Sequence, residues 1–330
     1  MTQSNVIASA VSTRVLDPER GLPFVVEHED QGDPALLVAW HRENRPFVEQ
    51  KLLEHGAVLF RGFRVNTPAA FARLTRAIAP GLLDCLDDNG PRTKLTTGIY
   101  TSTEYPAEYQ LSMHSEYAYS HKYPAHLYFC CVVEPQVGGA TPLGDNRRIL
   151  KRLAPEVVEE FRRKRVRYLR NLHGGSGFGL SWQAAFQTTD RAAVEDYCRT
   201  MSVDIEWKAD GGLRLTHTFD AVVTHPRTGE EVWFNQAPQF HPSDYPAEIY
   251  DSLMSSYRGK EDELPQTSSF GDGTPIDDAA LKHIRETMFA QSVVNPWREG
   301  DVVIIDNVLT CHGRMPFTGP RKILLAMSDK

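Results

Sequence analysis

The sequence predicts an α+β protein built around an antiparallel sheet or jelly roll. The middle and the end of the chain hold many short segments rich in aromatic and β-branched residues, whereas helical patterns gather at the front and in insertions. This segregation of strands and helices is typical of α+β folds. No predicted strand is followed by G-x-G-x-x-G or G-x-x-x-x-G-K-[ST], so the fingerprints of nucleotide-binding α/β folds are missing.

The front of the chain predicts a helix, a strand and a second helix. Residues 1–35 are polar and are expected to form an irregular N-terminal segment. Residues 35–56 predict a helix because apolar side chains recur every three to four positions. The apolar run GAVLFRGF (56–63) predicts a buried strand between glycines, and Thr67-Pro68 predicts the start of the second helix.

The rest of the chain alternates between strand and helix patterns. A D-G-G turn between two alternating stretches predicts a hairpin, and an acidic residue before an apolar-periodic run predicts a capped helix. The expected strands are 125–133, 166–172, the hairpin over 205–225, 227–236, 301–307 and 322–327; the expected helices are 155–165, 190–201, 244–257 and 277–291, with a loop at 268–277.

The charge balance argues against a nucleic-acid partner. Lysine and arginine total 36 against 43 aspartate and glutamate, a net charge of −7, whereas proteins that follow a phosphate backbone carry a basic surplus. This excludes a general polyanion binder, but it leaves room for a local basic site that binds a small anion.

The cysteines and the apolar runs predict a soluble, cytoplasmic protein. The cysteines are odd in number and show no C-x-x-C spacing, which disfavours a disulfide framework and a thiolate zinc site. No basic stretch followed by an apolar run opens the chain, and the longest apolar runs are strand-sized, so neither a secretory signal nor a membrane span is expected. The thiols expected to be free are Cys85, Cys130, Cys131, Cys198 and Cys311.

Three residues could bind one metal ion. In His114-Ser115-Glu116 an imidazole and a carboxylate stand two residues apart, and on an extended strand both would point to the same face. His312, after the apolar strand VVIID, is the best third ligand. Two imidazoles and one carboxylate form the facial set that leaves positions open on Fe(II) for oxygen chemistry. Most lone histidines are surface or hydrogen-bonded residues, so the H-x-E motif alone is a weak indicator.

Two residues could anchor a small carboxylate near that metal. Arg321 opens the last apolar strand, and a buried arginine is costly without an anion to pair with. Bidentate hydrogen bonds from its guanidinium would suit a carboxylate, to which Thr141 could offer a hydroxyl. The alternatives are a surface salt bridge for Arg321 and an ordinary turn for Thr141.

These motifs together resemble a known superfamily. The set HSE (114–116), GGAT (138–141), GDVVIIDN (300–307), HGRMPF (312–317) and GPRKILLAM (319–327) is similar to the taurine dioxygenase/clavaminate synthase-like oxygenases. The stretches WFNQ and FGDGTPIDDAALKHIR look closest to the branch with asparagine oxygenase and the syringomycin-type aspartyl hydroxylase. The resemblance covers residues 55–328 or so, and therefore implies a single catalytic domain over 1–330 with a double-stranded β-helix core.

The resemblance also implies the cofactors and their residues. Fe(II), 2-oxoglutarate and O₂ would be used, with His114, Glu116 and His312 matching the iron ligands. Thr141 and Arg321 match the residues that bind the distal carboxylate of 2-oxoglutarate, although Lys322 is a possible substitute for Arg321. Two departures are informative. Leu325 stands where taurine-type enzymes carry a sulfonate-binding arginine, and Glu116 stands where halogenating relatives have alanine or glycine.

The expected substrate contacts are Asn235, Gln236 and Arg170. The first two follow a strand toward the loop QFHPSDYP, where amides could meet an amino-acid headgroup; alternatively they only satisfy backbone groups at the strand end. Arg170 is separated from a basic helix face by an apolar strand and is expected to turn inward. The glycine-rich segment 173–179 is a plausible lid. Tyr117 and Tyr119 are further candidates for substrate contact, although they are out of step with His114 along an extended strand, so neither need face the iron.

The branch it resembles implies a role in specialised metabolism. We expect hydroxylation, or a related oxidation, of an unactivated carbon in an amino acid, free or carried as an aminoacyl group on a carrier protein. Desaturation, epoxidation or ring closure use the same ligands, and a catabolic taurine-type role is the runner-up. A jelly-roll binding protein without iron and a zinc hydrolase remain as other classes; nothing in the chain resembles H-E-x-x-H, and neither class explains Arg321 with Thr141.

Overall fold

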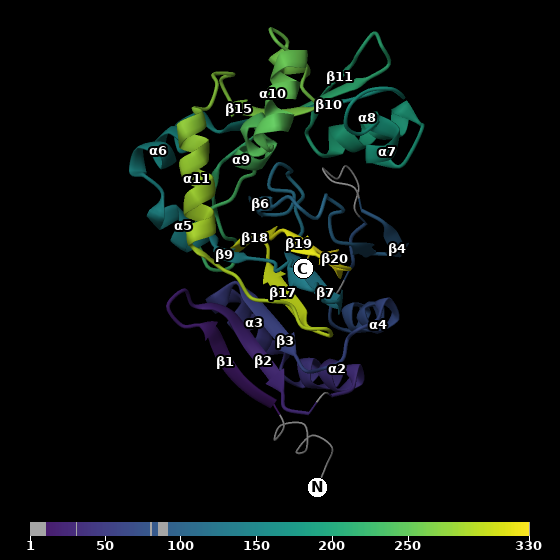
Figure 1. Ribbon diagram of the computed structural model, residues 1–330, viewed down its shortest axis with the longest axis vertical. Helices are drawn as coiled ribbons and strands as arrows, with labels where there is room; N and C mark the ends of the chain where they lie inside the picture. Colours follow the sequence, from purple (N-terminus) through teal and green to yellow (C-terminus); the bar gives the residue numbers. More distant parts are fainter. Residues whose placement is uncertain (1–10, 31, 80, 85–91, 330) are drawn as a thin grey trace.

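The computed structural model describes residues 11–30, 32–79, 81–84 and 92–329. Its largest element is an eight-stranded sheet (Figure 1). Its neighbouring strands are antiparallel except for one parallel pair, the second with the third. Across the sheet they run β1 (Val11–Asp17), β2 (Leu22–His28), β3 (Ala57–Arg61), β17 (Val302–Asp306), β7 (His126–Val133), β20 (Lys322–Ser328), β5 (Ile99–Thr101) and β4 (Lys94–Thr96).

A smaller antiparallel sheet shares its core with the large one. Phe129 and Leu325 from the large sheet belong to the same hydrophobic cluster as Met113, Leu143 and Cys311 from the small one. Burial of these side chains between two sheets is the main source of stability for such a layered arrangement. The four strands are β16 (Ser292–Val293), β9 (Leu143–Asp145), β18 (Thr310–Arg314) and β6 (Leu111–His114).

A third sheet lies beyond β6, at the top of Figure 1. Its strands are antiparallel, and the predicted hairpin is confirmed by the pairing of its first two strands across the D-G-G turn. The order is β11 (Asp204–Trp207), β12 (Leu213–Phe219), β10 (Val166–Leu172) and β15 (Gln266–Phe270), and two further strand pairs are β13 (Val222–Thr224) with β14 (Glu231–Trp233) and β8 (Val137–Gly138) with β19 (Phe317–Thr318).

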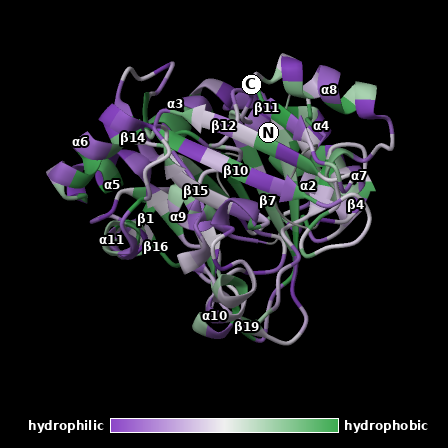
Figure 2. Cartoon of the chain, turned by 90° about the horizontal axis from the view of Figure 1, so that it is seen from above, coloured by the Kyte–Doolittle hydropathy of each residue, from purple (hydrophilic) through white to green (hydrophobic). Residues whose placement is uncertain are grey.

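The helices surround these sheets and bury one face each. In Figure 2, α6 and α8 carry both hydrophilic and hydrophobic residues, as expected of helices half-covered by the core. No helix among the described residues is long and apolar enough to cross a membrane. The helices are α2 (Pro34–Glu43), α3 (Arg45–His55), α4 (Pro68–Ile78), α5 (Asn146–Arg152), α6 (Pro155–Lys164), α7 (Trp182–Phe186), α8 (Arg191–Thr200), α9 (Ala237–Phe240), α10 (Ala247–Ser256) and α11 (Asp278–Ala290), with 3₁₀ turns η1 (Pro242–Asp244) and η2 (Glu261–Glu263).

The expectation of an irregular segment over residues 1–35 is wrong for the described part. β1 and β2 form a hairpin, and β2 continues the large sheet beside β3. Phe24, Val25 and Val26 are all buried, as is usual for a strand covered on both faces. β1 has no buried residue and three of its seven residues are exposed, so the sequence carried no buried-strand pattern there.

Two other elements differ from the prediction. The helix expected over 35–56 is two helices, broken at Asn44, because Pro46 cannot donate a backbone hydrogen bond and restricts the residue before it. The loop expected over 268–277 begins with strand β15, which pairs with β10. Its inward residue Ser268 is polar and donates to the Ala237 carbonyl at 2.7 Å, so the strand lacks an apolar alternation.

Candidate functional site

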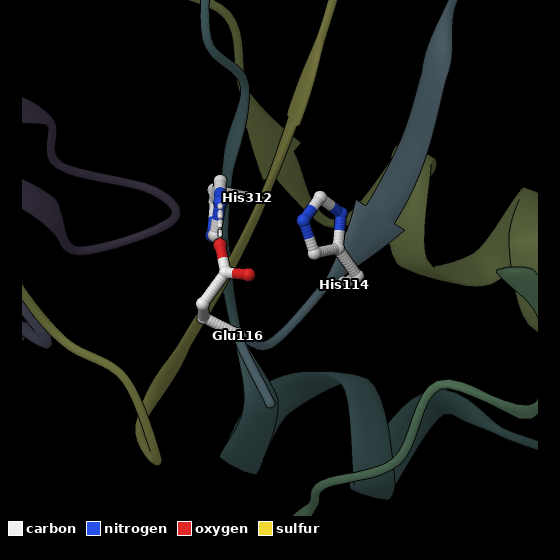
Figure 3. A group of neighbouring side chains, drawn as sticks. All are labelled: His114, Glu116 and His312. Carbon is white, nitrogen blue, oxygen red and sulfur yellow. Dashed lines mark ion pairs between the residues drawn. The ribbon is translucent and has the colours of Figure 1, made fainter. Parts of the chain in front are cut away.

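Three side chains with metal-ligand atoms converge between the sheets. His114 ends β6, His312 lies in β18, and the two residues are partners in the register of that pair. Glu116 follows in the turn after β6. One potential ligand atom from each of His114, Glu116 and His312 lies within 4.8 Å of the others, and all three residues are buried (Figure 3). Within the described ranges, this is the only such group of three or more His, Cys, Asp or Glu residues.

The contacts around the group suit a cation. His114 Nδ1 lies 2.8 Å from the Ser112 carbonyl, the kind of outer contact that orients a metal-binding imidazole. Glu116 Oε2 lies 3.7 Å from His312 Nε2 and is buried without a hydrogen bond. Burial, aided by His114 and Arg92, holds the pKa of His312 well below its usual range, so this imidazole is in the neutral form that binds metals. The arrangement therefore fits a divalent cation.

The turn after β6 is fixed by Asn307, a residue the sequence reasoning did not assign. Its Oδ1 accepts from the Glu116 amide at 2.8 Å, and its Nδ2 donates to the carbonyls of Glu116 and Pro124 at 2.8 and 2.9 Å. Asn307 is fully buried and follows β17 directly. Its position at the end of the VVIID strand, just before His312, was the available signal.

A second unassigned residue, Arg92, binds the candidate carboxylate ligand. Its Nη2 donates to Glu116 Oε1 at 2.9 Å, and both side chains are nearly buried. The carboxylate thus has one oxygen held by a guanidinium and the other turned toward the two histidines. Arg92 lies outside any strand, and nothing in its local sequence indicates the role.

The strand-parity argument for Tyr117 and Tyr119 does not hold, although Tyr119 keeps its place as a candidate substrate contact. The argument assumed an extended strand through Glu116, but β6 ends at His114 and the chain turns, with Tyr117 at φ +54°. Side-chain alternation fails in such a turn. Tyr119 therefore lines the same cavity as His114 and Glu116.

A narrow pocket connects the three residues with a partly buried arginine. His114, Glu116 and His312 line it at one end, and Thr141 and Arg321 line it at the other; Lys322 is not among its lining residues. Arg321 donates to the Gly139 carbonyl at 2.8 Å and has no carboxylate partner within the described chain. Burial and the nearby Arg314 lower its pKa to about 10. A cation in this setting is stabilised by an anion.

Thr141 is placed to donate to the same anion. Its Oγ1 accepts from Trp297 Nε1 at 3.1 Å and lies 3.5 Å from Arg321 Nη2. A hydroxyl with both lone pairs used still has its own hydrogen to donate. The pocket therefore offers a guanidinium and a hydroxyl to one carboxylate, beside the candidate metal ligands.

A larger cavity of about 420 Å³ opens on the other side of the same residues. This volume is typical of small-molecule sites. His114, Glu116 and Arg92 line both spaces, so the two meet at the candidate metal site. The predicted lid segment contributes Phe178 and Gly179 to the rim, and Phe178 is 59% exposed.

Two of the three predicted substrate contacts line this cavity. Arg170 is 2% exposed and projects into it from β10, and Gln236 lines it with a buried Oε1 that has no hydrogen-bond partner. Asn235 does not line it. Its amide donates to the Ala221 carbonyl and accepts from the Ala237 amide, so it satisfies backbone groups at the strand end. For Asn235 these hydrogen bonds favour the alternative, in which it satisfies backbone groups, over a substrate contact.

The cavity also contains an acidic residue that the sequence reasoning missed. Asp244 lies in the loop QFHPSDYP, where its Oδ1 accepts from Ser112 Oγ at 2.5 Å. Burial raises its pKa to about 6, against the lowering effects of Ser112 and Arg285. The loop was expected to meet the substrate, but its carboxylate was not singled out.

A protein-family model and curated relatives match most of the chain. The model described as "Taurine catabolism dioxygenase TauD, TfdA family" matches residues 16–327. The dapdiamide synthesis protein DdaC of Enterobacter agglomerans is 40% identical over 282 residues, covering 86% of this chain and 84% of that protein. A clavaminate synthase-like protein of Arabidopsis thaliana is 29% identical over 297 residues, covering 87% and 85%.

Solved structures share the fold at low sequence identity. PvcB, described as an Fe, alpha-ketoglutarate dependent oxygenase from an isonitrile synthetic pathway, has a TM-score of 0.53 at 16% identity, covering 97% of this chain and 92% of that one. AAD-2, solved with Mn(II) and N-oxalylglycine, has a TM-score of 0.55 at 14% identity, covering 96% of each chain. At these identities the likeness concerns the fold alone.

Proposed function

Because the chain belongs to the TauD, TfdA dioxygenase family, we propose that it oxidises an unactivated carbon of an amino acid, free or carrier-tethered, in specialised metabolite biosynthesis. The chain is an Fe(II)- and 2-oxoglutarate-dependent oxygenase. The observation that carries the assignment of residues is the group His114, Glu116 and His312 at the junction of a cavity and a pocket that ends on Arg321.

We assign the metal to His114, Glu116 and His312, and the distal carboxylate of 2-oxoglutarate to Arg321 and Thr141. Bound together, iron, 2-oxoglutarate and O₂ supply the oxidation of a C–H bond, with release of succinate and CO₂. The protein positions the reactants: Arg92 holds one oxygen of Glu116, and Ser112 fixes the ring of His114. Such outer contacts orient metal ligands.

The substrate is assigned to the 420 Å³ cavity, where Gln236 and Arg170 would contact it. Its walls combine these polar groups with Tyr119, Leu172 and Phe178, a mixture suited to a small molecule with polar ends. Hydroxylation is our first choice of outcome; desaturation, epoxidation or ring closure would use the same residues.

Specialised metabolism is favoured over taurine catabolism for two reasons. DdaC, which is 40% identical to this chain, is by its name a dapdiamide synthesis protein. In addition, Leu325 lines the inner pocket where taurine-type enzymes carry a second arginine. Leucine offers no charge to a sulfonate.

We propose one catalytic domain with a double-stranded β-helix core. Strands from both ends of the described chain, β1 and β20, belong to one sheet that shares its core with the smaller sheet. We also propose a reducing, cytoplasmic setting, because Cys130, Cys131 and Cys311 are buried thiols that form no disulfide within the described chain. Cys85 lies outside the described residues.

The test of the reaction is Fe(II)-dependent conversion of 2-oxoglutarate to succinate under O₂. We would offer free amino acids, the same residues as aminoacyl thioesters on a carrier protein, and taurine. Stimulation of succinate release by an amino-acid probe, with a product heavier by one oxygen atom, supports the proposal. Stimulation by taurine alone, or hydrolysis with Zn²⁺ in place of iron, would overturn it.

A further inference from the structure

The part of the cavity around Asp244 has the character of a cation site. Asp244 Oδ1 accepts from Ser112 Oγ, whereas Oδ2 has no hydrogen bond within the described chain. Arg285 forms a long ion pair with this carboxylate, with its Nε 3.8 Å from Oδ1, while its Nη1 and Nη2 donate to the Pro238 carbonyl and to Ser243 Oγ. One carboxylate oxygen therefore remains open toward the cavity that Asp244 lines.

Other groups beside Asp244 suit a protonated nitrogen. The rings of Tyr105 and Tyr245 line the same cavity, and the charge of Asp244 contributes to raising the pKa of both phenols, which places them close to the carboxylate. Aromatic faces next to an anion favour ammonium groups. Gln236, 3% exposed, adds a buried Oε1 without a partner.

The position relative to the metal site is suitable for a substrate contact. Ser112, which binds Asp244, stands two residues before His114 on β6, and its carbonyl fixes the His114 ring. Two residues of a strand span about 7 Å. A group held at Asp244 thus lies within a few bonds of a carbon next to the metal.

We infer that Asp244 binds a protonated amine of the substrate, with Tyr105, Tyr245 and Gln236 completing the site. This rests on the proposed function, because it names the chemical class of molecule that the oxygenase takes: one with a free amine, either an amino acid or an aminoacyl group whose amine is not acylated. A substrate in which a hydroxyl replaces the ammonium would lose the charge-assisted contact.

The experiment compares matched probes on the full-length enzyme. Protein loaded anaerobically with Fe(II) and 2-oxoglutarate is titrated with amino acids and aminoacyl pantetheine thioesters, each paired with its 2-hydroxy isostere. Binding is followed by calorimetry and by the change in the visible band of the iron chelate. We expect each bound amine to be favoured over its isostere by about 10- to 100-fold, the range for a hydrogen bond to a charged group.

A pair of variants assigns that preference to one carboxylate. Asp244→Asn keeps the acceptor for Ser112 and removes the charge, and Asp251→Asn is the control because Asp251 is exposed on α10. Asp244→Asn should abolish the amine preference, and Asp251→Asn should retain it. Equal binding of amine and isostere by the wild type, absence of any amine binding, or an unchanged preference in Asp244→Asn would overturn the inference. Absence of the chelate band itself would instead contradict the proposed function.

Discussion

The two halves of the candidate site, the narrow pocket and the larger cavity, are built differently. The side assigned to iron and 2-oxoglutarate rests on paired strands, with His114 on β6, His312 on β18 and Arg321 just before β20. The side assigned to the substrate comes largely from turns and short helices, with Gln236 before α9, Asp244 in η1 and Phe178 in the glycine-rich segment. Strand pairing holds the residues assigned to iron and 2-oxoglutarate in fixed positions, whereas the sequence and path of loops can change to suit a substrate. This division is common among enzymes.

The largest expected effect is on the strand side. His312→Ala should abolish iron binding and Fe(II)-dependent succinate formation while the protein stays folded, because only two ligands remain; the loss should exceed the roughly 100-fold caused by losing an outer-shell partner. Iron content and succinate release measure it. His41→Ala is the control, because His41 is buried on α2 and far from the ligand group in the fold. Full activity of His312→Ala would remove it from the ligand set.

The next effect separates two adjacent basic residues. Arg321→Leu should weaken 2-oxoglutarate binding by about 100-fold, because hydrogen bonds to a charged carboxylate are lost. Lys322→Leu should bind normally, since only Arg321 lines the pocket. Calorimetric titration of 2-oxoglutarate into the iron-loaded proteins measures both. The reverse pattern would transfer the role to Lys322.

Variants of two buried asparagines test whether the hydrogen bonds of Asn307 to the Glu116 backbone support iron binding. Asn307→Ala removes three hydrogen bonds at the Glu116 turn and should lower stability by about 2–4 kcal/mol. It should also weaken iron binding by about 10- to 100-fold. Asn235→Ala also loses backbone hydrogen bonds but contacts no ligand, so its Tm should fall while iron affinity is retained. Equal iron affinities in the two variants would show that the turn needs no such support.

The smallest effect is a pH dependence on the loop side. The pKa of Asp244 is raised to about 6, so its carboxylate is charged above that pH and neutral below it. Amine affinity should therefore fall about fourfold from pH 7.5 to 5.5. Tyr105 and Tyr245 face Asp244 together with Arg285; burial raises the pKa of both tyrosines, so their phenols stay neutral over this range. Calorimetric titration of the amine at both pH values measures this change. In Asp244→Asn the fourfold fall in amine affinity should be absent. An amine affinity that rises on acidification would contradict the assignment.

The residues assigned to iron and 2-oxoglutarate, which lie on or beside strands, were largely predictable from the sequence, whereas the residues from turns around the proposed substrate were not. His114, Glu116 and His312 stand in motifs whose spacing and neighbouring strands can be recognised directly, and Arg321 opens an apolar strand that needs an anion. Asp244 and Arg92 reach the cavity through turns, whose path depends on tertiary packing rather than on a periodic pattern. Asn235 and Gln236 are adjacent and both carry an amide side chain, and the turn at the end of the strand determines that only Gln236 lines the cavity.

The same limit applies to the fold. β17 and β20 are apolar and were predicted, whereas β1 and β15 are polar strands. β1 pairs with the next strand, β2, in a hairpin, and β15 pairs with β10, which is distant in sequence. Their stability comes from hydrogen bonds to a neighbouring strand and from burial of a few side chains. Neither is encoded in a local pattern.

The most direct test of the central claim is the anaerobic addition of Fe(II) and 2-oxoglutarate to the metal-free protein. If His114, Glu116 and His312 bind iron beside the Arg321–Thr141 anchor, the weak visible charge-transfer band of the chelate will appear, and it will shift when a substrate amine enters the cavity. Iron binding without that band would contradict the account, because the pocket between the ligands and Arg321 would then not hold 2-oxoglutarate.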